Sequence, residues 1–204
     1  MSEEAKPVDF DRLFLKQANL YRLQSFVDQY IIGGHVGPRF RMTEELILHM
    51  HGIAMNGLIA AAGDYRKGPV TLTNCPHVPP SYLEVPMHMK AMVEYVNDNW
   101  TKRDLIHLSA FVMWRLNWIH PFQNGNGRTS RAAAYLTLCA HHGNLLPPKN
   151  SIIAQIVKDR TPYYQALRAV DLDYDRTKDP GVCCGVLEQL TGYMLKEQLK
   201  ANFS

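Results

Sequence analysis

The segment HPFQNGNGRTSR, which starts at His120, holds residue types that could bind phosphate and move a proton. Gly125 and Gly127 let the backbone approach an anion closely, and such a turn before a helix presents amide donors to phosphate. Arg128 and Arg131 are three residues apart, so on a helix they share a face and can hold neighbouring phosphates. His120 could act as a base near neutral pH. The segment therefore predicts transfer of a phosphate ester.

Helices are expected on both sides of this segment. The run Leu105–Ile119 is apolar nearly all round, which predicts a central buried helix, and residues 101–104 resemble a capping box before it. A second helix should follow the segment and continue until Gly143, and Asn126 has a side chain suited to its N-cap. The histidine and the arginines would then lie at two adjacent helix ends.

Apolar residues at helical spacing predict five further helices. They are expected within residues 1–39 up to Gly33 and Gly34, from Thr43 to Gly63, from Pro86, from Thr161 and Pro162, and over residues 180–199 from Asp179 and Pro180. The N-terminal helix is predicted by residues that repeat at helical spacing, namely Leu13, Leu20, Leu23, Val27 and Ile31.

Residues 67–80 alone have a non-helical pattern. Residues 70–73 are strand-forming, whereas Asn74, Pro76, Pro79 and Pro80 favour turns, so a short exposed hairpin is expected. The chain has no internal repeat and no linker. The expected fold is all-α, with residues 1–204 forming one domain that carries a single short β-hairpin.

Composition narrows the class of protein. With 204 residues, 46% of them hydrophobic, the chain is long enough for one well-buried core. A net charge of +3 without a lysine or arginine run does not favour nucleic-acid binding, and no apolar stretch suggests a membrane span or signal peptide. The four cysteines lack metal-site spacing and favour a reduced, cytoplasmic protein; they are Cys75, Cys139, Cys183 and Cys184.

The segment at His120 resembles the signature of the Fic-domain family, HPF-x-(Asp/Glu)-GN-(Gly/Lys)-R-x-x-R. Outside it, residues 62–66 and 68–72, AGDYR and GPVTL, are similar to the segment that opens the family's flap. Residues 82–86 and 160–167 also resemble family segments, so the resemblance covers about residues 40–172. It implies a Fic-type helical bundle with a β-hairpin flap.

The resemblance also implies an activity, protein adenylylation. In the family, the histidine equivalent to His120 takes a proton from a Ser, Thr or Tyr hydroxyl of a target protein, which attacks the α-phosphorus of ATP. AMP is transferred and pyrophosphate leaves. The flap, here Val70, Thr71 and Leu72, would dock the target by main-chain pairing. The residues expected at the nucleotide are Phe122, Asn124, Gly125, Asn126, Gly127, Arg128, Arg131 and Tyr164.

Some of these residues have simpler structural interpretations. Phe122 is expected to fill the core, and Arg128 could be a surface helix residue. Either Tyr163 or Tyr164 would stack on the base, although an aromatic residue at a helix start often only packs. The histidine pairs 49/51 and 141/142 do not face one site on a helix, so neither predicts a metal site.

One position departs from the signature. The family carries Asp or Glu where this chain has Asn124, and that carboxylate would ligate Mg²⁺ between the nucleotide phosphates. Mg²⁺ prefers carboxylate oxygens, so the change is expected to weaken the metal site by about 10- to 100-fold. The alternatives to adenylylation are a transferase with another nucleotide donor and a catalytically weakened nucleotide-binding module.

In the Fic family, regulation often depends on a glutamate. Fic proteins are often restrained by a helix with Ser/Thr-x-x-x-Glu-Gly/Asn, whose glutamate pairs with the arginine equivalent to Arg131. None of the eight glutamates in this chain has Ser or Thr four residues before it. No internal inhibitory motif is therefore expected, and control would come from a separate antitoxin-like protein or be absent.

Overall fold

The computed structural model describes residues 9–73, 75–179, 181 and 184–203. The expected all-α class is confirmed, since no strand occurs among these residues. Their helical elements are α1 (Phe10–Ile32), η1 (Gly37–Arg39), α2 (Glu44–Met55), α3 (Val85–Asn99), α4 (Leu105–Ile119), α5 (Asn126–His142), α6 (Ile152–Lys158), α7 (Thr161–Thr177) and α8 (Gly185–Phe203).

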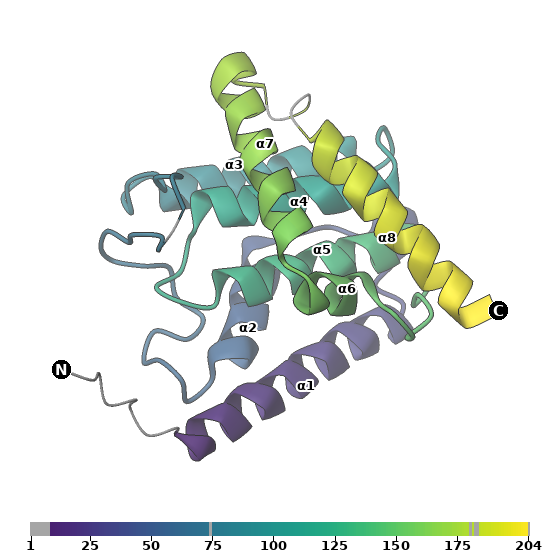
Figure 1. Ribbon diagram of the computed structural model, residues 1–204, viewed down its shortest axis with the longest axis horizontal. Coiled ribbons are helices and arrows are strands. Elements are labelled where there is room, and N and C mark those ends of the chain that lie inside the picture. Colours follow the sequence, from purple (N-terminus) through teal and green to yellow (C-terminus); the bar gives the residue numbers. More distant parts are fainter. Residues whose placement is uncertain (1–8, 74, 180, 182–183, 204) are drawn as a thin grey trace.

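Helix α4 has the predicted bounds and lies in the middle of the bundle (Figure 1). Its cap is Asp104, whose carboxylate accepts the His107 N–H at 2.8 Å, so the capping box predicted at residues 101–104 is wrong. The side chains of α4 are buried on nearly all sides of the helix, as the apolar run predicted. Trp114 and Leu116, for example, are at most 1% exposed.

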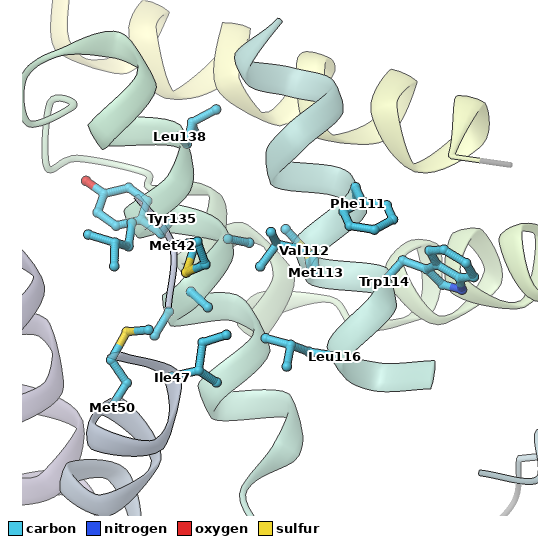
Figure 2. Packing of buried hydrophobic residues seen from close by; sticks show 14 of the residues in the cluster. Met42, Ile47, Met50, Phe111, Val112, Met113, Trp114, Leu116, Tyr135 and Leu138 are labelled. Carbon is cyan, nitrogen blue, oxygen red and sulfur yellow. The ribbon is translucent and has the colours of Figure 1, made fainter. Parts of the chain in front are cut away.

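Helices α4 and α5 form the main packing pair of the fold. Together with residues from α2 they build the core in Figure 2, which includes Phe111 of α4, Leu138 of α5 and Ile47 of α2. Each side chain of this size contributes about 1.5–3 kcal/mol when it is fully buried. Helix α5 ends at Gly143, as predicted, where the C-cap has a φ of 88°.

Helix α1 crosses α2 and α5 along one side of the bundle (Figure 1). It begins after Asp9, which accepts the Arg12 N–H, and it ends at Gly33 as predicted. Of the residues that repeat at helical spacing, Leu23, Val27 and Ile31 are buried, whereas Leu13 and Leu20 are 49% and 39% exposed.

Helix α2 is shorter than predicted. It ends at Met55, and the chain turns at Asn56 and Gly57, which has a φ of 69°. The apolar residues up to Gly63 suggested a continuing helix, but they lie in irregular backbone that packs against α2. After this irregular segment, Arg66 contacts the loop before α5, since its N–H donates to the Pro121 carbonyl at 2.8 Å.

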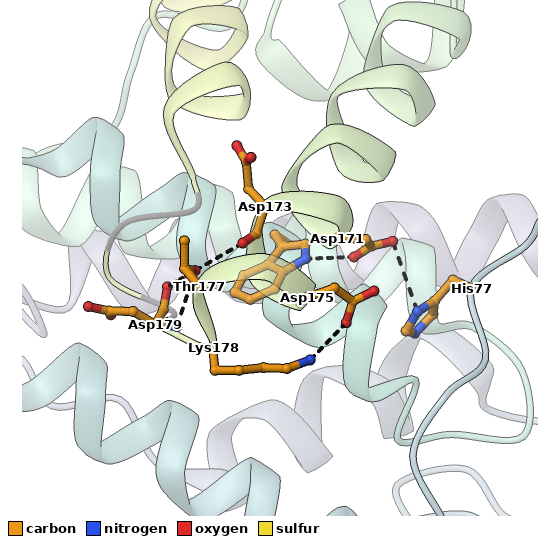
Figure 3. A network of polar contacts seen from close by, with 8 residues as sticks. His77, Asp171, Asp173, Asp175, Thr177, Lys178 and Asp179 are labelled. Atoms are coloured by element: carbon orange, nitrogen blue, oxygen red, sulfur yellow. Dashed lines mark hydrogen bonds and ion pairs between the residues drawn. The ribbon is translucent and has the colours of Figure 1, made fainter.

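The flap segment, residues 67–80, contains no β-hairpin among its described residues, so that prediction was wrong. Its prolines supply no N–H for a strand ladder, and an isolated two-stranded hairpin is marginally stable. A side chain holds the segment instead: His77 bonds through Nε2 to the Trp118 carbonyl at 2.8 Å. Figure 3 shows the other ring nitrogen of His77 facing Asp171 of α7, 4.0 Å away, while Asp171 also accepts from Trp114.

The C-terminal helices cover the other side of α4. Helix α7 starts at Thr161 as predicted, whereas α8 starts at Gly185 rather than near residue 180; Pro180 itself lies outside the described residues. Buried His107 joins α8 to α4 by a hydrogen bond between its Nδ1 and the Glu188 carboxylate at 2.9 Å. None of the described helices combines the length and apolar character that a membrane crossing requires.

Candidate active site

His120 stands at the C-terminal end of α4. It is the C-cap, with left-handed φ and ψ of 50° and 56°, and its N–H donates to the Leu116 carbonyl. The Nδ1 atom lies 3.3 Å from the Asn117 carbonyl oxygen. Because a carbonyl only accepts, this contact places the proton of the neutral ring on Nδ1. The Nε2 lone pair is then available as a base, and the residue lines a cavity.

The surroundings keep the His120 ring uncharged. Burial is the main cause that lowers its pKa from 6.5 to about 4, and electrostatic repulsion from Arg66 and from His77 acts in the same direction, against the Asn117 contact. At neutral pH the ring is therefore unprotonated and can accept a proton.

Arg66 fixes the backbone around the histidine. Its buried guanidinium donates to the carbonyls of His120 at 2.8 Å, Gly68 at 3.1 Å and Pro80. Its own N–H donates to the Pro121 carbonyl at 2.8 Å. One side chain thus joins both ends of the flap segment to the loop that carries the base.

His51 of α2 holds the middle of loop 120–125. The Gly63 N–H donates to its Nδ1 at 3.0 Å, so the neutral ring carries its proton on Nε2 and donates it to the Asn124 carbonyl at 2.9 Å. The ring also stacks on Phe122, with centroids 3.7 Å apart and an interplanar angle of 5°. Burial lowers the pKa of His51, which favours this neutral form.

Asn126 has a different role from the predicted one. The N-cap of α5 is Gly125, with a φ of 83°, and Asn126 is the first helical residue. Its side chain bonds both backbone groups of Phe122, accepting from the N–H at 2.9 Å and donating to the carbonyl at 2.8 Å. The prediction of Asn126 as N-cap was wrong because this amide is already used to close the loop.

Gly125 cannot be exchanged for a larger residue without strain. Its positive φ disfavours other residues, and a Cβ at this position would lie 2.6 Å from Sδ of Met55 and 3.3 Å from Nε2 of His51. The close approach of the loop to α2 therefore depends on the missing side chain.

A cavity of about 570 Å³ opens beside this loop. The polar part of its lining, referred to below as the polar end, consists of His120, the first turn of α5 and arginines, and none of its lining residues is Asp or Glu. The first amides of a helix have no acceptor within the helix, so those of Asn126 and Gly127 suit an anion. The apolar part of the lining, referred to below as the apolar end, comes from α1 and α6, with Leu20, Leu23, Val27, Ile153 and Val157.

Three arginines line the polar end. Arg128 donates to the Ala54 carbonyl at 3.3 Å, and the guanidinium of Arg131 lies over Gly127, with one nitrogen 3.1 Å from where a Cβ would be. Arg160 reaches the cavity from the N-cap of α7. Burial lowers the pKa of Arg128 and of Arg131, and the charge of Arg131 adds to the effect on Arg128. An anion would relieve this concentration of positive charge.

The remaining predicted residues divide between cavity and core. Tyr164 lines the cavity and is 54% exposed, whereas Tyr163 is buried and accepts from Asn117 at 2.9 Å. Phe122 is fully buried, as expected for a core residue, and does not line the cavity. The flap residues Val70, Thr71 and Leu72 do not line it either.

Sequence reasoning gave no role to His51, Arg66, Asn117 or Arg160. For His51 a signal existed, because it lies on the same face of α2 as Ile47 and Ala54, and a polar residue on an apolar face usually has a buried partner. The contacts of Arg66 and Asn117 join segments distant in sequence, so no local pattern indicates them.

The residues around Asn124 do not fit a magnesium ion held by the protein. The Asn124 Oδ1 accepts the Gly125 N–H at 2.6 Å, and no carboxylate lines the cavity. The described residues include no group of three or more His, Cys, Asp or Glu that could hold a metal. Mg²⁺ is bound in proteins chiefly by carboxylate oxygens, and this donor set offers only a neutral amide.

Comparisons with known proteins agree with this arrangement of helices. The model of the Fic/DOC family matches residues 41–138, which include His120 and both arginines of the motif. A Fic family protein from Desulfovibrio desulfuricans G20 has a similar structure, with a TM-score of 0.66 and 20% identity over 91% of this chain and 53% of that chain.

Two further solved structures are similar. For a Fic domain containing signaling protein from Bacteroides thetaiotaomicron VPI-5482, the TM-score is 0.67 and the identity 18%, over 100% of this chain and 73% of that chain. For Fic-1 from C. elegans, the TM-score is 0.63 and the identity 20%, over 98% of this chain and 54% of that chain. The chain thus spans about half the length of the Desulfovibrio and C. elegans chains. Residues 41–138 therefore match the model of the Fic/DOC family, and the chain has the fold of solved Fic proteins.

Proposed function

We propose that this protein transfers AMP from ATP to a Ser, Thr or Tyr hydroxyl of a target protein. A Fic/DOC family domain generally implies nucleotide transfer. The observation that carries the proposal is that the available Nε2 of a neutral His120 belongs to the same cavity as the first turn of α5 and the arginines. A base, amide donors and cations are the groups that phosphoryl-type transfer requires.

In the proposed reaction, Nε2 of His120 accepts the proton of the target hydroxyl. The hydroxyl oxygen forms a bond to the α-phosphorus, the bond from that phosphorus to the bridging oxygen breaks, and pyrophosphate leaves. The amides of Asn126 and Gly127 would donate to the phosphates, and Arg128 and Arg131 would balance the charge on the leaving group. The apolar end of the cavity would receive the base and ribose, with Tyr164 against the base.

The target would dock on the flap segment. The described backbone of Val70, Thr71 and Leu72 pairs with no strand, so its amides and carbonyls can accept an extended segment of another protein. Arg66 and His77 would hold this segment near His120 while the target binds. A small antitoxin-like protein is a second proposed partner. No glutamate among the described residues lines the cavity, where α1 contributes Gln24, so an inhibitory glutamate would come from another protein.

Another donor nucleotide is the main competing function, because the apolar end of the cavity carries few polar groups that would select one base. The test is to incubate the protein with α-labelled ATP, UTP or GTP and a lysate or candidate target, and to measure covalent label. Label from ATP is expected, and label only from UTP or GTP would change the donor. Nucleotide binding without label from any of them would favour a binding module.

His120→Ala provides the control for this experiment. Removing the base should reduce transfer by about 10²- to 10⁴-fold while nucleotide binding and folding remain. His142→Ala, at an exposed position on α5, should transfer like the unaltered protein. Full activity of His120→Ala would show that the residue is not the base.

A further inference from the structure

The polar end of the cavity has an unusual balance of charge. Arg128, Arg131 and Arg160 line it, and no acidic side chain does. Two of the arginines lie on successive turns of α5 and the third comes from α7. Cations from two separate helices therefore surround one space, and the lining itself supplies no countercharge.

Arg160 is the member of this group that lies outside the signature. It is the N-cap residue of α7, and α7 continues with Tyr164, which also lines the cavity. The neighbouring Asp159 accepts the Thr161 N–H at 2.9 Å, so this carboxylate caps the helix rather than entering the cavity. Arg160 lies close enough to Arg131 for its charge to help lower the pKa of that guanidinium, after burial.

Asn124 lies at the point where the family signature has its acidic residue. Its carbonyl is held by His51, and its Oδ1 is held by the Gly125 N–H at 2.6 Å. Both oxygens of the residue are thus already hydrogen-bonded, and neither carries a charge. Arginine, in contrast, offers a permanent charge and a planar fork that matches phosphate.

We propose that Arg128, Arg131 and Arg160 neutralise the phosphates of the donor nucleotide in this cavity, in place of a divalent cation held by the protein. This inference rests on the proposed nucleotide site and adds to it both the role of Arg160 and the replacement of the metal. Free ATP carries more negative charge than its magnesium complex, so three guanidinium groups should bind the free form at least as tightly.

The test is to measure nucleotide binding, without turnover. Isothermal titration calorimetry of the full chain with ATP, ADP and AMP is performed in EDTA and in excess Mg²⁺. ATP should bind in EDTA at least as tightly as in Mg²⁺, and affinity in EDTA should fall from ATP to ADP to AMP as phosphates are removed. Binding of ATP that requires Mg²⁺ would overturn the inference and leave the proposed function intact. Absence of nucleotide binding in both buffers would overturn the proposed function and the inference with it.

Arg160→Gln tests the third arginine. It should lower the affinity for ATP in EDTA by about 10-fold, as expected for one charge-assisted contact, and affect AMP less. Lys158→Gln is the matched control, because it removes the same charge from an exposed residue at the end of α6 that does not line the cavity. Equal affinities of the two variants would exclude a role for Arg160.

Asn124→Asp tests whether the missing carboxylate is the reason why arginines take the place of the metal ion. Restoring a carboxylate should make ATP binding stronger in Mg²⁺ than in EDTA, by about 10-fold. Circular dichroism of each variant verifies the fold. A variant that binds ATP equally in both buffers would overturn the assignment of the missing metal ligand to Asn124.

Discussion

Loop 120–125 and the flap segment both border the reactive histidine, and they are built in opposite ways. The loop is held at nearly every residue, by His51 on its carbonyl, by Asn126 on both backbone groups of Phe122 and by the contact of Gly125 with α2. The flap segment is held at its ends by Arg66 and at one further position by His77. The groups that would meet the nucleotide are preorganised, whereas the backbone that would meet a target protein is left available.

Among the tests of this difference between the two segments, Gly125→Ala should have the largest effect, because it should disturb the rigid loop. The strain of a positive φ and the contact with Met55 should together cost about 2–5 kcal/mol of folding free energy and displace the loop. Gly143→Ala is the matched control at the other end of α5, since its φ is 88° but nothing lies within 4 Å of the added Cβ. It should lose about 1 kcal/mol in thermal unfolding, with transfer unchanged. Equal losses in both variants would show that the contact with α2 is unimportant.

Titration of His120 examines the same rigid region. Its ring signal in NMR, assigned with His120→Ala, should titrate with a midpoint of about 4 because burial penalises the charged form. The folded-state pKa lies below the ordinary 6.5, so the unfolded chain binds the proton more readily and stability falls as pH drops from 6.5 towards 4. ATP should raise the midpoint, since negative charge favours the protonated ring. A midpoint near 6.5 would mean that the ring is solvated.

His77→Ala should loosen the flap segment alone. Losing the bond to the Trp118 carbonyl, worth about 1 kcal/mol, should accelerate amide exchange in the flap segment by about fivefold. Exchange in loop 120–125 should not change, and neither should ATP affinity. Hydrogen-exchange mass spectrometry measures both segments in one experiment, with His142→Ala as the reference. Faster exchange in the loop as well would show that the two regions are one cooperative unit.

The smallest effect on transfer is expected when single glutamates are substituted. None lines the cavity, so purified protein should be active without an activating substitution. Each of the eight glutamates changed singly to glycine should leave transfer within about twofold, apart from losses caused by destabilised helices. An increase of an order of magnitude in any variant would reveal an internal brake with a sequence unlike the family motif.

The sequence predicted those parts of the fold that are determined by contacts between residues close together in the chain. The bounds of α4 followed from a mostly apolar run, and Gly33 and Gly143 marked helix ends because they act within one turn. The end of α2 was missed because apolar residues continue past Gly57 into irregular backbone.

Predictions that needed a distant partner were less successful. The strand-forming residues 70–73 pair with no strand. Hydrogen bonds from the side chains of Arg66 and His77 hold the segment instead. Asn126 has the composition of a cap, but the backbone of Phe122 competes for its amide. His51 could be recognised as a buried polar residue, yet its bond to the Asn124 carbonyl spans 73 positions in the chain.

The position of the base at the turn between two paired helices has a consequence for folding. His120 closes α4 and Gly125 opens α5, so the proposed chemical groups are neighbours in sequence as well as in space. Contacts of short sequence separation form with little loop entropy, and paired helices collapse early. We expect the histidine, the amide donors and the first arginine to come together once this helical hairpin forms, before α1 and α8 complete the walls. The reactive geometry would then be among the first parts of the native state to appear.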